Sequence, residues 1–81
     1  MYTKQDFARE LKKKIFNKEK VRIIGNWAYS VYFEHMGYID KNFERLLLKL
    51  SAMEEGPQFA RSYEELDDIA DRLIAGEDVT L

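Results

Sequence analysis

The single histidine, His35, is the residue best suited to acid–base chemistry near neutral pH. Its neighbour Glu34 is poorly placed to orient the imidazole, because consecutive helical residues point about 100° apart. We therefore expect His35 to lie in the core or at its rim, hydrogen-bonded to a backbone carbonyl or a tyrosine, rather than to act as a catalytic base. The chain has no cysteine, which excludes a thiolate nucleophile and a cysteine-based zinc site, and one histidine excludes a multi-histidine metal site.

A cluster of carboxylates lies near the C-terminal end of the chain, where Glu64, Glu65, Asp67, Asp68 and Asp71 fall within eight residues. Helix-borne metal sites usually take their ligands from two or more helices, and no loop has the ligand spacing of a calcium-binding EF-hand. A metal or catalytic role is therefore disfavoured. The cluster is either a solvated helix face or a docking surface for a basic partner, and the candidate partner-binding residues are Glu64, Asp67, Asp68 and Asp71.

Charge is distributed unevenly along the chain. Residues 1–22 hold eight Lys/Arg against three Asp/Glu, residues 23–53 hold three of each, and residues 54–81 hold two Arg against nine acids. If the first and last helices are neighbours, their charges neutralise each other in part. Otherwise, one end of the chain is a docking surface for an oppositely charged partner.

The basic residues make nucleic-acid binding an alternative function. Cations of the first helix would lie along phosphates, and a second basic ridge with four-residue spacing would extend the footprint. A pI near 5.4 and an acidic last helix oppose this interpretation. The candidate nucleic-acid-binding residues are Arg9, Lys12, Lys13, Lys14, Lys41, Arg45 and Lys49.

The stretch Val21–Tyr38 is predicted to form a helix that is apolar on two sides. One face carries Val21, Ile24, Ala28, Val31 and His35, and the far side carries Tyr29, Phe33 and Met36. Such a helix is typical of one that other helices surround, so we expect the second set to be core. The alternative is an exposed patch edged by Arg22 and Asn26, which would mark an interface with another protein or with a second copy of this chain.

The sequence predicts four helices near residues 3–17, 18–36, 40–55 and 62–75, followed by a frayed tail at 76–81. Helix caps are expected at Thr3, Asn17, Asp40 and Ser62, and helix ends at Gly37, Gly56-Pro57 and Gly76. Gly25, inside the second helix, indicates a close approach by a neighbouring segment. Phe59 is expected to plug one end of the bundle. The predicted fold is all-α, a compact four-helix, bundle-like single domain with an apolar central second helix.

Composition favours a small globular domain, with 81 residues of which 46% are apolar and 35% charged. No run of eighteen apolar residues exists, and Met1–Glu10 lacks the apolar region of a secretory signal, so we expect a cytoplasmic protein with no membrane contact.

The pattern of residues contains no nucleophile–base pair, phosphate-binding loop or metal cluster, so the sequence predicts no cofactor and no enzyme. The predicted function is a small protein–protein interaction module, a regulator or inhibitor. It would dock on another protein, for example one with a basic surface, through the acidic last helix or through Tyr29 and Phe33.

Overall fold

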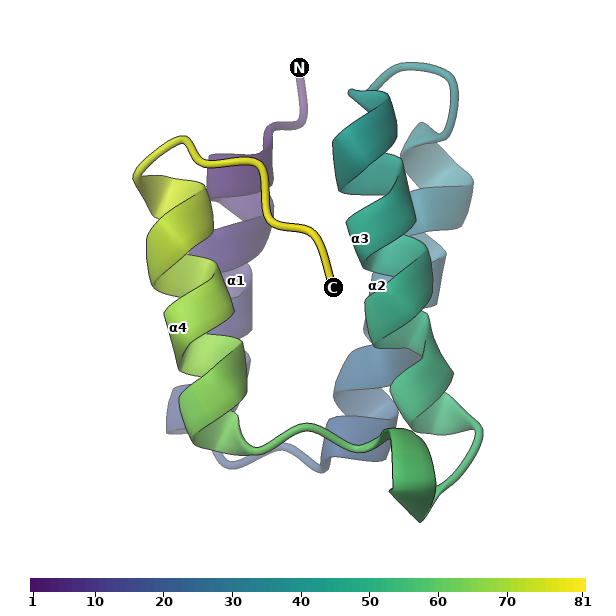
Figure 1. Ribbon diagram of the computed structural model, residues 1–81, viewed down its shortest axis with the longest axis vertical. Helices are drawn as coiled ribbons and strands as arrows, with labels where there is room; N and C mark the ends of the chain where they lie inside the picture. Colours follow the sequence, from purple (N-terminus) through teal and green to yellow (C-terminus); the bar gives the residue numbers. More distant parts are fainter.

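The computed structural model describes all 81 residues and contains four α-helices and two short 3-10 turns (Figure 1). The elements in chain order are α1 (Lys4–Phe16), α2 (Val21–His35), α3 (Lys41–Ser51), η1 (Ala52–Glu54), η2 (Pro57–Phe59) and α4 (Tyr63–Ile74). The predicted all-α, four-helix fold class is confirmed. None of the helices is long and apolar enough to cross a lipid bilayer.

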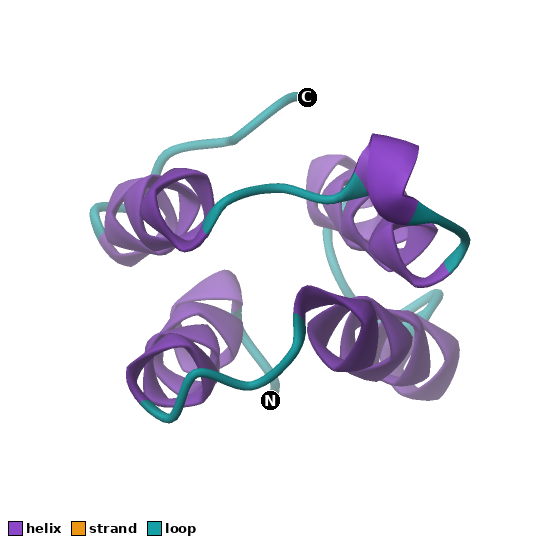
Figure 2. Ribbon diagram, turned by 90° about the horizontal axis from the view of Figure 1, so that it is seen from below, coloured by secondary structure: helices purple, strands orange, loops and turns teal.

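Seen end-on, the helices form a two-by-two array in which successive helices run antiparallel (Figures 1 and 2). The closest backbone packing is within two pairs, α1 with α4 and α2 with α3. Side chains between the pairs form a single apolar core. Phe7 of α1 joins the pairs, because its ring stacks on Trp27 of α2 at 4.6 Å and meets Phe43 of α3 edge-on at 5.6 Å.

Three helices begin at a side-chain cap, as predicted. Thr3 and Ser62 each form a complete capping box, with Asp6 and Glu65 respectively, and Asp40 accepts hydrogen bonds from the first amides of α3. α2 differs, because it begins at Val21, later than predicted, after Lys20, which makes no capping hydrogen bond. The predicted cap for this helix, Asn17, instead ends α1.

The prediction that the other helices surround α2 is wrong. α2 occupies one corner of the array (Figure 2), and its buried residues, Ile24, Gly25, Ala28 and Val31, form a single stripe that faces the core. Because each of the four helices turns one stripe toward the common centre, the second apolar set of α2 has nothing to cover it. Tyr29, Phe33 and Met36 are therefore exposed.

The chain after α4 is packed rather than frayed. It crosses between α3 and α4 (Figure 1), and the side chain of Val79 is only 2% exposed. Lys4 holds this segment by donating to the Gly76 carbonyl at 2.8 Å and to Asp78 at 3.1 Å. The expected plug at the other end is also wrong, since Phe59 is exposed.

Gly25 lies where α2 touches η1, as its position in the sequence predicted. A methyl group added at its Cα would stand 2.9 Å from the Glu54 amide nitrogen, 3.1 Å from Met53 Cβ and 3.2 Å from the Leu50 carbonyl oxygen. Two of these neighbours are backbone atoms, which cannot rotate away. The absence of a side chain is what lets η1 approach α2 so closely.

We predict that Gly25→Ala lowers the free energy of unfolding. In a helix with free space around it, alanine is more favourable than glycine by about 1 kcal/mol. Here the clash of the added methyl group with η1 costs about 1–3 kcal/mol, so the net effect is a loss of stability. Chemical denaturation of both proteins measures the difference. Ser30→Ala, on the exposed side of the same helix, serves as the control and should leave stability almost unchanged; a more stable Gly25→Ala protein would contradict the packing.

Candidate functional site

His35 is a rim residue held by an aromatic stack. Its ring lies parallel to that of Tyr2 at a centroid distance of 4.3 Å, and its Nε2 is 3.9 Å from Glu34 Oε2, too far for a hydrogen bond. The His35 side chain makes no hydrogen bond, so the predicted one to a carbonyl or tyrosine is not formed. The Tyr2 hydroxyl is buried without a partner, and this burial, reinforced by nearby carboxylates including Glu10, raises the pKa of Tyr2. The pair packs the rim, and no group orients His35 as a base.

The acidic cluster on α4 is partly neutralised from within the molecule. Lys12 of α1 places its Nζ 2.6 Å from Asp71 Oδ1 and 3.0 Å from Asp67 Oδ1. The hydrogen bond to Asp71 makes the larger contribution to raising the pKa of Lys12, and the hydrogen bond to Asp67 raises it further. Glu64 and Asp68 are exposed and make no ion pair. The predicted acidic surface is therefore divided, with half of its candidate residues engaged by the first helix.

Most basic residues of α1 are also paired internally. Arg9 contacts Asp6 at 3.3 Å, and Lys14 contacts Glu19 at 3.5 Å while lying 4.8 Å from the centre of the Trp27 ring. Lys13 alone among the α1 candidates is exposed and without an ion pair.

The second basic ridge does not extend the first. Lys41, Arg45 and Lys49 are exposed on α3, without ion pairs, and α3 lies at the corner of the array diagonally opposite α1 (Figure 2). The structure thus separates the two halves of the predicted nucleic-acid footprint. No three His, Asp or Glu side chains converge so as to hold a metal ion.

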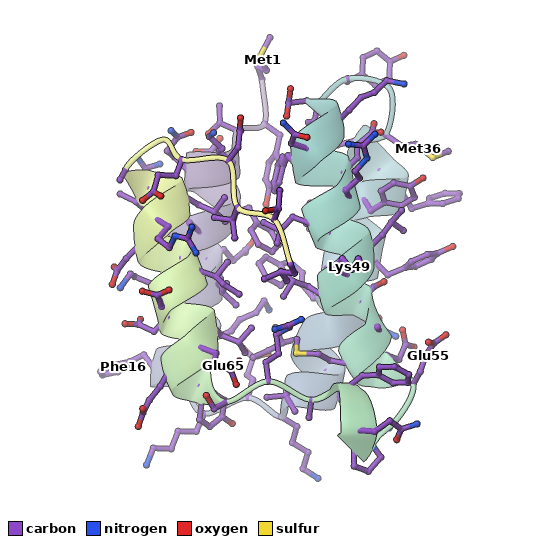
Figure 3. The ribbon with its side chains drawn as sticks, in the orientation of Figure 1. Met1, Phe16, Met36, Lys49, Glu55 and Glu65 are labelled. Carbon is purple, nitrogen blue, oxygen red and sulfur yellow. The ribbon has the colours of Figure 1, made fainter.

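The aromatic patch on α2 departs from an ordinary polar surface. On α2, Tyr29, Phe33 and Met36 are 48%, 61% and 46% exposed, directly opposite the buried stripe. Figure 3 shows Met36 pointing away from the bundle. Arg22 and Asn26 share this side of the helix. We call the side formed by these five residues the outer face of α2.

Two further exposed apolar residues border the outer face. Leu48 of α3 is one helical turn beyond Glu44, whose carboxylate accepts a hydrogen bond from the Gly37 amide at 2.8 Å just after α2 ends. At the other end Gly25 contacts Glu54, so the antiparallel register places Leu48 level with Tyr32 and Phe33. Ile23 is the second residue, on the opposite border and also exposed.

Sequence reasoning did not single out Leu48 or Ile23. The sequence does contain a signal for Leu48. Three consecutive leucines of one helix, Leu46–Leu48, cannot all point into the core of the protein, so the third points outward. The same argument applies to Ile23, because its neighbour Ile24 is the one that faces the core.

Comparisons with models of known protein families, with curated proteins and with solved structures find no match to this chain.

We predict that Lys12→Met lowers the free energy of unfolding by about 0.5–1 kcal/mol, because it leaves Asp67 and Asp71 facing each other without a cation. Lys13→Met, the exposed neighbour, is the matched control and should have no effect. Denaturation at low and at high salt measures both. The difference between the two variants should shrink in high salt, and equal stability of the two at low salt would contradict the pairing.

The pH dependence of this pairing follows from the raised pKa of Lys12. A group that holds its proton more tightly in the folded state contributes its full stability below its ordinary pKa of 10.5 and loses it as the pH rises above that value. The stability difference between the native protein and Lys12→Met should therefore be constant through neutral pH and diminish only in strong alkali.

Proposed function

We propose that this protein is a small, non-enzymatic protein-interaction module that binds its partner through the outer face of α2. The observation that carries the proposal is the exposure of Tyr29, Phe33 and Met36 together on one helix face. Large aromatic and methionine side chains grouped on a surface are typical of interfaces, and burying them removes apolar area from water.

Two polar groups at the middle of α2 support the proposal, because each already has a hydrogen-bond partner inside the chain. The Asn26 Nδ2 already donates to Glu54 Oε1 at 2.9 Å, and the Ser30 hydroxyl donates to the Asn26 carbonyl at 3.2 Å. A buried donor without a partner costs about 1–3 kcal/mol, and here both donors are satisfied inside the chain. A partner can therefore bury Asn26 and Ser30 at little polar cost.

Two contacts on the core side of α2 support the face. On the core side, Trp27 is stacked against Phe7, and Gly25 fixes the helix against η1. Apolar side chains presented on a helix that is held at two points lose little further freedom on binding.

The outer face is favoured over the acidic helix because Lys12 already holds Asp67 and Asp71. Glu64 and Asp68 remain available to a basic partner, and would steer its approach in a salt-dependent way. A regulator or inhibitor needs only such a surface and no reacting group.

A photo-reactive phenylalanine analogue placed at Phe33 tests the proposal in the cells from which the protein comes. Phe16 is the matched control, because it is the same residue type, is 86% exposed and lies on α1. We expect position 33 to give a discrete protein adduct on irradiation and position 16 to give none, with the adduct identified by mass spectrometry. Adducts no stronger at 33 than at 16 would disprove the proposal, and a nuclease-sensitive adduct would favour nucleic acid.

A further inference from the structure

The charges of α2 are arranged against the dipole of their own helix. Its N-terminal end, where the helix is positive, carries Lys20 and Arg22, no acidic residue in the first turn and no side-chain cap. Glu34 lies in the last turn, at the negative end. The other three α-helices have acidic residues in the first turn and Lys or Arg in the last, whereas the last turn of α2 has only His35 as a basic residue. α2 alone would therefore gain from an anion at its start and a cation at its end.

These charged groups are available to an external partner. Lys20 and Arg22 are exposed and make no ion pair, and the one basic group within ion-pair distance of Glu34 is His35, at 3.9 Å. Arg22 and Glu34 lie twelve positions apart, about 18 Å along the helix axis, and three residues of the outer face, Asn26, Tyr29 and Phe33, fall between them in the sequence. A partner that complements this face presents an anion at one end, apolar groups in the middle and a cation at the other end.

The α2 helix of a second copy, running in the opposite direction, meets this description. We propose that a second copy of this chain packs its α2 antiparallel against the outer face, about a two-fold axis level with the exposed pair Asn26 and Ser30. This inference rests on the proposed function, whose partner it names. The negative end and Glu34 of one copy then lie beside Lys20 and Arg22 of the other, and the symmetry forms the same contact twice.

Two pairs of exposed positions on α2 match each other in this register. Positions equally far from Ala28 become neighbours, so Ile23 meets Phe33 of the second copy, and Asn26 meets Ser30 of the second copy. The exposed Ile23 and Phe33 thus bury each other. Asn26 and Ser30 are polar and comparatively small, and their donors are already bonded within the chain, so the two helices can approach closely at the centre.

Nothing in the rest of the molecule opposes such a pair. α2 lies at a corner of the array, and no other segment covers its outer side (Figure 2). The net charge of each chain is only −2, so long-range repulsion between two copies is weak.

Reciprocal charge reversal tests the antiparallel arrangement in the purified 81-residue chain. One variant carries Lys20→Glu and Arg22→Glu, and the other carries Glu34→Lys. Each variant alone would place like charges together, whereas a mixture would restore opposite charges at both ends. Sedimentation velocity of each protein and of the mixture, from about 1 µM to about 1 mM, measures the dimer dissociation constant.

We expect the native chain to dimerise, each variant to dimerise at least about tenfold more weakly, and the equimolar mixture to recover native affinity as a mixed dimer. A native chain that stays monomeric up to about 1 mM would overturn the inference. So would variants that dimerise as well as the native chain, because a parallel pair already places like charges together and would not be weakened by the reversal.

A melting curve of each variant separates association from folding. Glu at positions 20 and 22 suits the positive end of the helix, so the first variant should be at least as stable as the native monomer while dimerising less. The two proposals also fail separately. A monomeric native protein whose position 33 still forms an adduct with a different protein in cells would reject self-association and leave the proposed function standing, whereas no adduct at position 33 would reject the function.

Discussion

The fold depends on the stack of Phe7 against Trp27. The backbones of α1 and α4 pack closely on each other, and so do those of α2 and α3, so the two pairs need side chains large enough to bridge the space between them. Phe7 is completely buried and meets Trp27 almost parallel, with the edge of Phe43 completing the contact. Aromatic rings supply both the area and the preferred geometry for such a bridge.

That bridge also decides which side of α2 faces solvent. With Trp27 drawn toward α1 and Gly25 against η1, the helix cannot rotate about its axis, and Tyr29, Phe33 and Met36 must point outward. The exposed face is thus a consequence of how the core is closed. Charge is handled differently, because Lys12 and the acids of α4 neutralise one another across the pair to which α2 does not belong.

Local features of the fold could be predicted from the sequence, because local chemistry determines them. The caps at Thr3, Asp40 and Ser62 depend on a hydrogen bond to an amide two or three residues away, and the left-handed residue Gly37 depends on its missing side chain. The close approach of a neighbouring segment at Gly25 was also predicted correctly. In each case the residue type and its position along the helix were enough.

Tertiary features were harder to predict, because periodicity tells which residues share a face but not what lies against it. Tyr29, Phe33 and Met36 formed a recognisable set, yet whether they were core depended on the position of the other three helices. The pairing of Lys12 required α1 beside α4, which the uneven charge only hinted at. The segment that holds Val79 was expected to fray because it lies near the end of the chain, although the apolar side chain of Val79 is buried.

The position of the only tryptophan makes the junction between the helix pairs visible to spectroscopy. Trp27 is partly buried, with the ring of Phe7 on it and the ammonium group of Lys14 near it. Separation of the two pairs would expose the indole to water and move its fluorescence emission to longer wavelength. Because no second tryptophan contributes, the emission of this protein reports on one place, the contact that holds its two halves together.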